Sequence, residues 1–382
     1  MTEKLYYQDS HRSTFHAKVL SCEQRKDGYQ IALDRTVFFP EGGGQYADPG
    51  YLDEVEVTDV HERDGVIWHY TKEPIPEGKE VEGRILWEVR FERMQQHTGE
   101  HIVSGLVHQM FGYDNVGFHL GEDYCTMDFN GPITKEQLKE IEWKANQAVF
   151  QNLDVISSFP SDEERSHMEY RSKIELTGPV QIITIPGYDV CACCAPHMKK
   201  TGEIGLIKLV QMDHYKGGER ITMLAGSRAL RDYEEKERNV KEISALLCVK
   251  EGETAEAAAR LKEEQKEQKD RLASMQQKLL RYQAREIPVD GEYTLVFDGK
   301  LTGNGPRELM NLLLERGANI CLVFAGNDED GYRYVCGSHK EDVRPAGKRL
   351  NEAFHGRGGG KAEMVQGSVQ GTEEEIRRFF GN

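Results

Sequence analysis

The chain has few cysteines, no long apolar run and no excess of positive charge. Its 382 residues include eight cysteines and carry a formal net charge of −16. Cysteines this sparse do not form a disulfide scaffold, and they suit a reducing compartment. No apolar stretch approaches the roughly 20 residues that span a bilayer, and the amino terminus lacks the features of a signal peptide. We therefore expect a cytoplasmic protein without membrane contact, whose contacts with nucleic acid, if any, are local.

Hydropathy patterning divides the chain into four predicted segments. Residues 1–85 alternate apolar and polar positions in short runs broken by turn residues, which predicts a small antiparallel β-barrel. Residues 86–227 combine a long amphipathic helix with strands. Residues 228–287 have helical spacing, and residues 288–382 alternate strands with helices in an α/β pattern. The expected fold class is α+β.

The helical segment carries an apolar seam with two polar layers in its middle. Its residues follow an alternating three- and four-residue spacing, which is typical of heptads. We expect an antiparallel helical hairpin, and a long dimeric coiled coil is the alternative because both leave similar sequence traces. The seam consists of Ala258, Leu261, Gln265, Gln268, Leu272, Met275, Leu279 and Tyr282.

Two short motifs, about a hundred residues apart, each offer two ligands to a metal ion. His97 and His101 are four positions apart in the amphipathic helix, so they share one face. Cys193 and His197 add a thiolate and an imidazole, which completes a zinc ligand set. A histidine pair of this kind also occurs as the polar edge of a core. However, burying three imidazoles and a thiol without partners is costly, and a shared ion compensates that cost.

The histidine motif also fits a pattern of zinc proteases. Residues 97–101 read H-x-x-E-H, in which the glutamate is the general base. Gly99 is unfavourable in a catalytic helix of that type, and the protease needs a downstream carboxylate ligand where this chain supplies a Cys/His pair. Glu100 stays a candidate base, with a solvated helix residue as the alternative. The sequence leaves open whether the metal is catalytic or structural.

A glycine run forms the third motif. Gly42, Gly43 and Gly44 allow the backbone to approach a ligand closely or to adopt positive φ, and Gln45 can donate or accept hydrogen bonds. Taken alone, such a run is a flexible turn in most chains.

The three motifs in this order resemble the AlaX family of free-standing alanyl-tRNA editing proteins and the editing domain of alanyl-tRNA synthetase. The matching residues are 38–45, 96–101, Cys193 with His197, and 201–205. The helical segment and the glycine run at 356–361 look like the carboxy-terminal DHH-associated domain of the synthetase. The resemblance therefore covers nearly the whole chain and implies a long-form member. No aminoacylation domain is expected before the barrel.

The resemblance implies a trans-editing hydrolase that cleaves the ester joining serine, or glycine, to the tRNA for alanine. Its metal ligands, carried over to this sequence, are His97, His101, Cys193 and His197, with one Zn²⁺ per chain. Cys194 stands where the synthetase commonly has glycine, so a ligand exchange between the two cysteines stays open, although the spacing favours Cys193.

The substrate needs little acid–base machinery, because an aminoacyl ester is already activated and no ATP is required. The enzyme has to place a water and stabilise the oxyanion, using zinc or amides of the glycine loop. We expect Thr98 and Gln45 to contact the amino acid or the terminal adenosine, and His119 to lie on the same wall. Alanine is smaller than serine, so selectivity requires a hydrogen bond to the serine hydroxyl, for which Thr98 is the candidate.

Basic residues between positions 344 and 361 are candidates for tRNA binding. Arginine and lysine beside a glycine-rich turn suit phosphate oxygens, although a solvated face is the simpler alternative. The resemblance implies tRNA-elbow binding and homodimerisation through this domain. Two other functions stay open, namely a tRNA-binding adaptor with a structural zinc and the metalloprotease. The basic residues are Arg344, Lys348, Arg349, Arg357 and Lys361.

Overall fold

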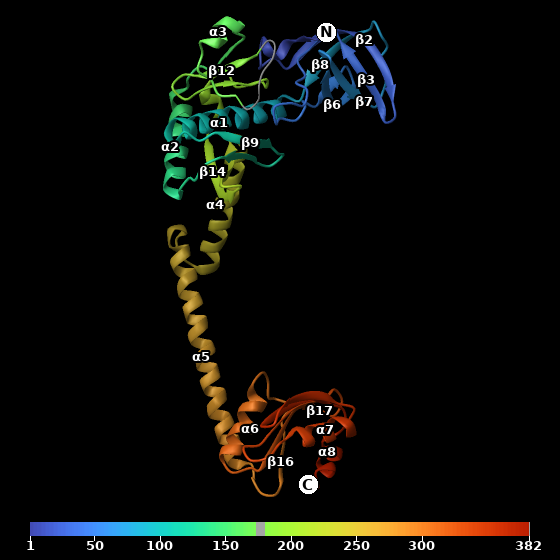
Figure 1. The fold of residues 1–382 in the computed structure, drawn as a ribbon, viewed down its shortest axis with the longest axis vertical. Helices are drawn as coiled ribbons and strands as arrows, with labels where there is room; N and C mark the ends of the chain where they lie inside the picture. The colour runs from blue at the N-terminus through green and yellow to red at the C-terminus, as the bar shows by residue number, and fades with distance from the viewer. Residues whose placement is uncertain (173–179, 382) are drawn as a thin grey trace. The chain divides into compact units, whose positions relative to one another are not determined.

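A computed structural model describes residues 1–172 and 180–381 of the chain. The packing of the backbone divides it into two units, residues 1–242 and residues 243–382. Helices and sheets occur together in each unit, so the expected α+β class is confirmed (Figure 1). The finer division into four segments stays a prediction.

The first unit begins with six antiparallel strands that close into a barrel. Along the first of them, Phe15, Ala17 and Val19 are buried and alternate with exposed residues, as the two-residue period of a strand requires. A short parallel pair, β1 (Glu3–Lys4) with β4 (Arg35–Thr36), accompanies the barrel. The barrel strands, in spatial order, are β2 (Thr14–Arg25), β3 (Gly28–Leu33), β7 (Val66–Thr71), β6 (Val55–Arg63), β5 (Gly50–Leu52) and β8 (Glu80–Ile85).

His69 of β7 is a fully buried imidazole in this part of the fold. Its Nδ1 donates to the carbonyl of Ile31 at 3.1 Å, and its Nε2 accepts from the hydroxyl of Thr36 at 2.8 Å. Both nitrogens are therefore satisfied in the neutral ring. Burial disfavours the charged form and lowers the pKa of His69 to about 4.

Acid is expected to weaken the first unit through His69. The unfolded chain binds a proton near pH 6.5, whereas folded His69 does so only near pH 4. The stabilisation is complete above pH 6.5 and is lost as the pH falls to 4, a change of about 3 kcal/mol. The chain's three tryptophans, Trp68, Trp87 and Trp143, all lie in this unit, so their fluorescence during urea titrations measures its unfolding. His69→Gln should flatten the pH dependence between 4 and 6.5, and an unchanged slope would contradict this role.

Helix α1 (Trp87–Phe111) forms the centre of the remaining first unit. Its apolar residues, including Met94, Ile102 and Leu106, pack into one core with a four-stranded sheet and helix α2 (Lys135–Gln151). The helix ends at Gly112, whose left-handed conformation (φ 71°) caps it. The sheet has the order β14 (Ile207–Tyr215), β15 (Gly218–Ala225), β10 (Cys125–Phe129) and β9 (Asn115–Leu120).

A second, three-stranded sheet lies beside α1. Its last strand contacts the helix and leads directly into the loop that carries the Cys/His motif. The 3-10 turn η2 (Thr201–Ile204) follows this loop, and α4 (Ser227–Leu247) begins after the four-stranded sheet. The strands of the second sheet are β11 (Ile156–Ser158), β12 (Ile182–Ile185) and β13 (Asp189–Ala192), and α3 (Asp162–Ser166) follows β11 in the chain.

The second unit contains a five-stranded sheet covered by helices on both faces. One apolar cluster joins the sheet to α6 (Gly305–Glu315), and the other joins it to α7 (Arg344–Ala353) and α8 (Glu373–Phe379). The first two strands are parallel and the others antiparallel. The strand order is β16 (Tyr293–Phe297), β17 (Ile320–Asn327), β18 (Gly331–Gly337), β20 (Met364–Val369) and β19 (Arg357–Lys361).

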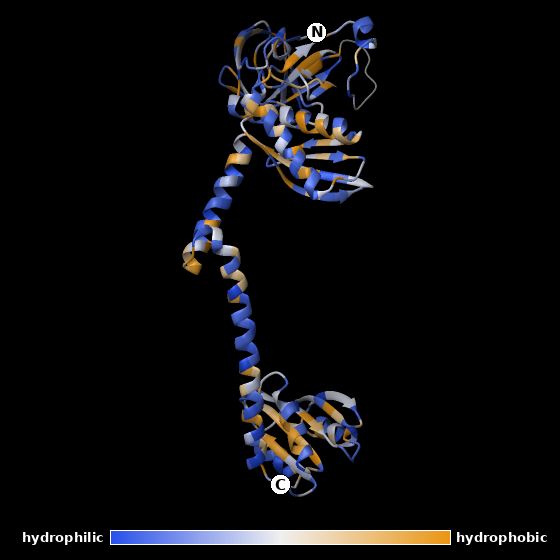
Figure 2. Cartoon of the chain, turned by 90° about the vertical axis from the view of Figure 1, so that its left-hand side faces the viewer, coloured by the Kyte–Doolittle hydropathy of each residue, from blue (hydrophilic) through white to orange (hydrophobic). Residues whose placement is uncertain are grey.

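Helix α5 (Thr254–Glu286) carries the predicted seam, and most of it is hydrophilic (Figure 2). Its buried residues near the carboxyl end, Leu280 and Ala284, belong to the core of the second unit and not to the seam. The hairpin and the dimeric coil therefore both stay predictions. Among the described residues, no helix has the length and apolarity needed to cross a bilayer. The large apolar residues of the seam, each between 51% and 65% accessible, are Leu261, Leu272, Met275, Leu279 and Tyr282.

Candidate metal centre

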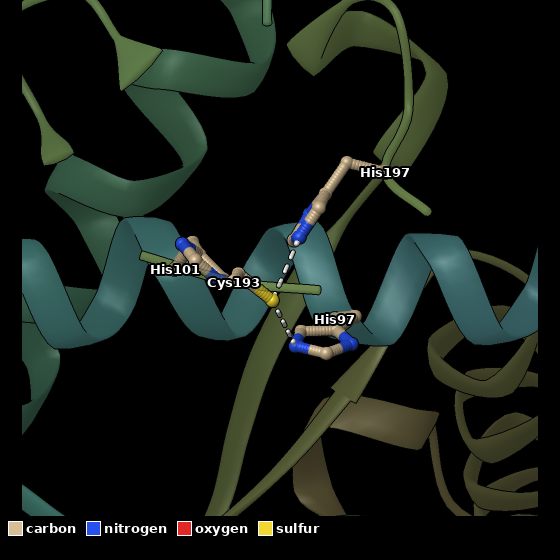
Figure 3. A group of neighbouring side chains, drawn as sticks. All are labelled: His97, His101, Cys193 and His197. Atoms are coloured by element: carbon tan, nitrogen blue, oxygen red, sulfur yellow. Dashed lines mark hydrogen bonds between the residues drawn. The ribbon is translucent and has the colours of Figure 1, made fainter. Parts of the chain in front are cut away.

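The four predicted metal ligands converge on one point (Figure 3). Helix α1 presents His97 and His101 on one face, and the loop after β13 brings in Cys193 and His197. The sulfur of Cys193 lies 3.5 Å from Nε2 of His97 and 3.4 Å from Nε2 of His197. The four ligand atoms all lie within 4.8 Å of one another.

The donor set fits a tetrahedral zinc ion. Zinc–nitrogen bonds of about 2.0 Å and zinc–sulfur bonds of about 2.3 Å at tetrahedral angles separate nitrogen from sulfur by about 3.5 Å. The two nitrogen–sulfur distances to Cys193, 3.5 and 3.4 Å, are close to this value. These four side chains could therefore hold a metal ion between them.

Each histidine is also held from behind through its Nδ1. The partners are Gln45 Oε1 at 3.0 Å from His97, Asp189 Oδ2 at 2.9 Å from His101, and Thr98 Oγ1 at 3.2 Å from His197. When Nδ1 carries the proton and donates it outward, Nε2 keeps its lone pair for the ion. The amide oxygen of Gln45 and the carboxylate of Asp189 can only accept, so they select this tautomer for His97 and His101.

Burial favours the neutral forms of Cys193 and His197 in the absence of a cation. It raises the pKa of the Cys193 thiol well above its usual range, and the neighbouring Cys194 adds to this effect. Burial, followed by the nearby His101 and His97, lowers the pKa of His197 well below its usual range. A cation must therefore displace the thiol proton, while it finds the imidazole already neutral.

The glycine run lets a loop approach this cluster closely. Gly43 and Gly44 have positive φ, 59° and 82°. A β-carbon on Gly44 would lie 2.9 Å from the ring of Phe118, which is too close for any other residue. Paired backbone hydrogen bonds of 3.0 Å between Gly42 and Gln45 close the turn and place Gln45 behind His97.

A cavity of about 550 Å³ opens beside the cluster. Its wall includes Gly43, Gly44, His97, Phe118 and Glu100. Glu100 is 1% exposed. Its Oε1 accepts hydrogen bonds from Ser104 at 2.7 Å and from Asn115 at 2.6 Å. Glu100 is therefore a fixed, buried carboxylate on the cavity wall, and the alternative of a solvated helix residue is wrong.

Known proteins of similar sequence agree with the resemblance to editing proteins that the motifs indicate. A family described as the threonyl and alanyl tRNA synthetase second additional domain matches residues 180–223, which include Cys193 and His197. The chain is 29% identical to the alanyl-tRNA editing protein Aarsd1 of Rattus norvegicus, over 96% of this chain and 93% of that protein. It is 26% identical to the alanyl-tRNA editing protein AlaX-L of Pyrococcus horikoshii, over 98% and 96% of the two chains. The chain is thus similar to these two alanyl-tRNA editing proteins along nearly its whole length.

The resemblance drawn from the ordered motifs is thereby confirmed, and it extends to part of a larger enzyme. The alanine–tRNA ligase of Methanopyrus kandleri is 32% identical over 96% of this chain, which spans 42% of the ligase. Because 96% of this chain is matched, the region shared with that ligase includes both metal-ligand motifs and most of the second unit.

Two predicted substrate contacts lie behind the ligands. Thr98 is fully buried, and its hydroxyl accepts from the amide of Met198 at 3.1 Å in addition to contacting His197. Gln45 is 1% exposed, and its Nε2 is a buried donor without a hydrogen-bond partner among the described residues. Their roles in substrate contact stay predictions.

Other predicted residues lie away from the cluster. His119 is exposed and near the ring of Tyr46, whereas its neighbour Phe118 lines the cavity, 4.9 Å from His97 between ring centres. Cys194 is exposed and does not belong to the cluster formed by Cys193.

The five basic residues predicted to bind tRNA all lie in the second unit. Arg344 pairs with Asp342 at 2.6 Å, and Lys348 lies 3.8 Å from Glu352. Arg349 lies over the ring of Phe379, while Arg357 and Lys361 are exposed on the edge strand β19. Arg357 and Lys361 thus lie on the same strand, whereas Arg344, Lys348 and Arg349 each contact a neighbouring side chain.

Proposed function

We propose that this protein is a trans-editing hydrolase that removes serine, or glycine, from mischarged tRNA for alanine, with one Zn²⁺ held by His97, His101, Cys193 and His197. The observation that carries the proposal is the convergence of three imidazoles and a thiol at the wall of a cavity of about 550 Å³. The names of the full-length relatives support the same reaction.

When bound, zinc supplies a Lewis acid that polarises the ester carbonyl or a water. Glu100 is placed to take a proton from a water in the cavity as that water attacks the carbonyl. The carbon–oxygen bond to the ribose then breaks, and Glu100 returns the proton to the departing ribose oxygen. Ser104 and Asn115 fix its carboxylate for this task, and the backbone of Gly43 and Gly44 lines the same wall.

Selectivity for serine requires a polar group that alanine cannot use. Thr98 is one candidate, but its hydroxyl would have to exchange a contact with His197 or Met198 to meet a substrate. Gln181 is a second candidate, because it lines the cavity and its buried Oε1 has no hydrogen-bond partner among the described residues. Its Nε2 is held by Ser157 at 2.6 Å, so the acceptor is already oriented.

For the body of the tRNA we propose the basic residues of the second unit, with Arg357 and Lys361 on the edge strand as the best placed. We also propose that the protein forms a homodimer through this unit, because its sequence resembles the carboxy-terminal domain of alanyl-tRNA synthetase.

A deacylation assay tests the proposed function. Purified, zinc-loaded protein is mixed with tRNA for alanine charged with serine, glycine or alanine, and release of the amino acid is followed. We expect hydrolysis of the first two, and Glu100→Gln should lower kcat by about 10² to 10⁴-fold. Tight tRNA binding without hydrolysis would support the adaptor, and peptide cleavage abolished by Glu100→Gln would support the protease.

The same assay identifies the residue that selects serine. A change in the ratio of the hydrolysis rates of seryl- and alanyl-tRNA in Thr98→Val or in Gln181→Leu would assign that role to the substituted residue.

A further inference from the structure

A buried carboxylate holds His101 on the side opposite the ligand cluster. Oδ2 of Asp189, the first residue of β13, lies 2.9 Å from Nδ1 of His101. The Asp189 side chain is 2% exposed. The other two ligand histidines, His97 and His197, have the neutral partners Gln45 and Thr98. Among the described Nδ1 contacts of these three histidines, only that of His101 involves an anion.

Arg171 fixes the position of this carboxylate. Its Nε donates to Oδ1 of Asp189 at 2.8 Å, and its terminal nitrogen donates to Oδ2 at 2.9 Å. The backbone of Arg171 is itself bound to β13, through Val190 at 2.8 Å and Ala192 at 2.9 Å. A forked pair of this kind fixes both distance and orientation. The carboxylate thus contacts both the imidazole of His101 and the guanidinium of Arg171.

A glycine on α1 makes room for Asp189. Gly105 lies one helical turn after His101, so the two residues share a face. A β-carbon on Gly105 would lie 2.2 Å from the carbonyl oxygen of Tyr188 and 2.8 Å from the β-carbon of Asp189. Any other residue would therefore force β13 away from the helix. The close approach that brings Asp189 to His101 depends on this glycine.

We infer that Asp189 is a positioning residue that fixes the tautomer and orientation of His101 and makes it the strongest nitrogen donor of the metal centre. Arg171 holds the Asp189 carboxylate in place, and the missing side chain of Gly105 leaves room for it. A carboxylate that accepts the outward N–H increases the basicity of the inward nitrogen, and loss of such a partner typically costs 10- to 100-fold in metal affinity. The inference rests on the metal site of the proposed function but not on its substrate.

The test compares Asp189→Asn with the wild type in binding of Co²⁺ and Zn²⁺. The asparagine keeps the shape but loses the charge and the forked pair with Arg171. We expect affinity to fall 10- to 100-fold and the visible spectrum of the Co²⁺ protein to change. In ¹⁵N-labelled protein, His101 should carry its proton on Nδ1 in the wild type and lose this single tautomer in the variant. Arg171→Gln should act in the same direction and serves if the first variant does not fold.

Asp128→Asn is the matched control, because Asp128 forms a similar forked pair with Arg220 at 2.6 and 2.7 Å without contacting a histidine. It should leave metal affinity within about twofold. Folded Asp189 and Arg171 variants with wild-type affinity, spectrum and His101 tautomer would overturn the inference. A wild type that binds Co²⁺ but does not deacylate tRNA would overturn the proposed reaction alone, whereas a wild type that binds neither metal would overturn the positioning role together with the metal site.

Discussion

Replacing Cys193 with alanine is expected to remove the metal and to abolish deacylation of seryl-tRNA. Cys193 is the one cluster member that can bring a negative charge to the ion, since the other three are imidazoles. The apparent binding free energy of a four-ligand zinc site is about 10–16 kcal/mol, so one ligand contributes about 2.5–4 kcal/mol, or roughly 10²- to 10³-fold in affinity. Metal content after dialysis and kcat/KM with seryl-tRNA measure the two effects.

Cys194→Ala is the matched control for this substitution. The two cysteines are adjacent, but Cys194 is exposed and lies outside the cluster. We expect Cys194→Ala to keep its metal through the same dialysis. If instead Cys194→Ala loses zinc and Cys193→Ala retains it, the ligand exchange left open by the sequence is the correct arrangement.

The ligand cluster was predictable because its pairs are local in sequence. His97 and His101 share a helix face by spacing alone, and Cys193 and His197 lie in one loop. Their outward partners were not predictable in the same way. Asp189 meets His101 across 88 positions and Arg171 reaches Asp189 across 18, and neither pairing has a local signature. A carboxylate that begins a strand just before a cysteine cluster is the only hint the sequence offers.

The sequence also did not predict which way some side chains point. Glu100 occupies a helix rich in polar residues, so its burial against Ser104 and Asn115 depends on how α1 packs on β9. Phe118 and His119 are neighbours on that strand, and alternation places one on the cavity and the other at the surface. Periodicity likewise found the seam of α5, but it could not show that Leu280, outside the seam, is the residue buried in the core.

The barrel is joined to α1 by a buried ion pair that also closes the glycine loop. Arg90 is fully buried and Asp48 is 1% exposed. Nε of Arg90 lies 3.0 Å from both carboxylate oxygens, and a second guanidinium nitrogen donates to the carbonyl of Val37 at 2.7 Å. Asp48 also accepts from the amide of Phe39 at 2.7 Å. The loop between Phe39 and Asp48 contains the glycine run and Gln45, so this pair holds Gln45 against His97.

Asp48→Ala is therefore expected to destabilise the first unit by about 3–5 kcal/mol, because it leaves the Arg90 guanidinium buried without a counter-charge. Urea unfolding followed by tryptophan fluorescence measures this loss, since all three tryptophans lie in that unit. Lys236→Gln, which breaks an exposed pair with Asp232, is the control and should cost less than about 1 kcal/mol. Adding Arg90→Met to Asp48→Ala should recover part of the loss, because it removes the unpaired charge. A double variant less stable than Asp48→Ala would show that the guanidinium's bonds to Val37 and Ser10 outweigh its need for a counter-charge.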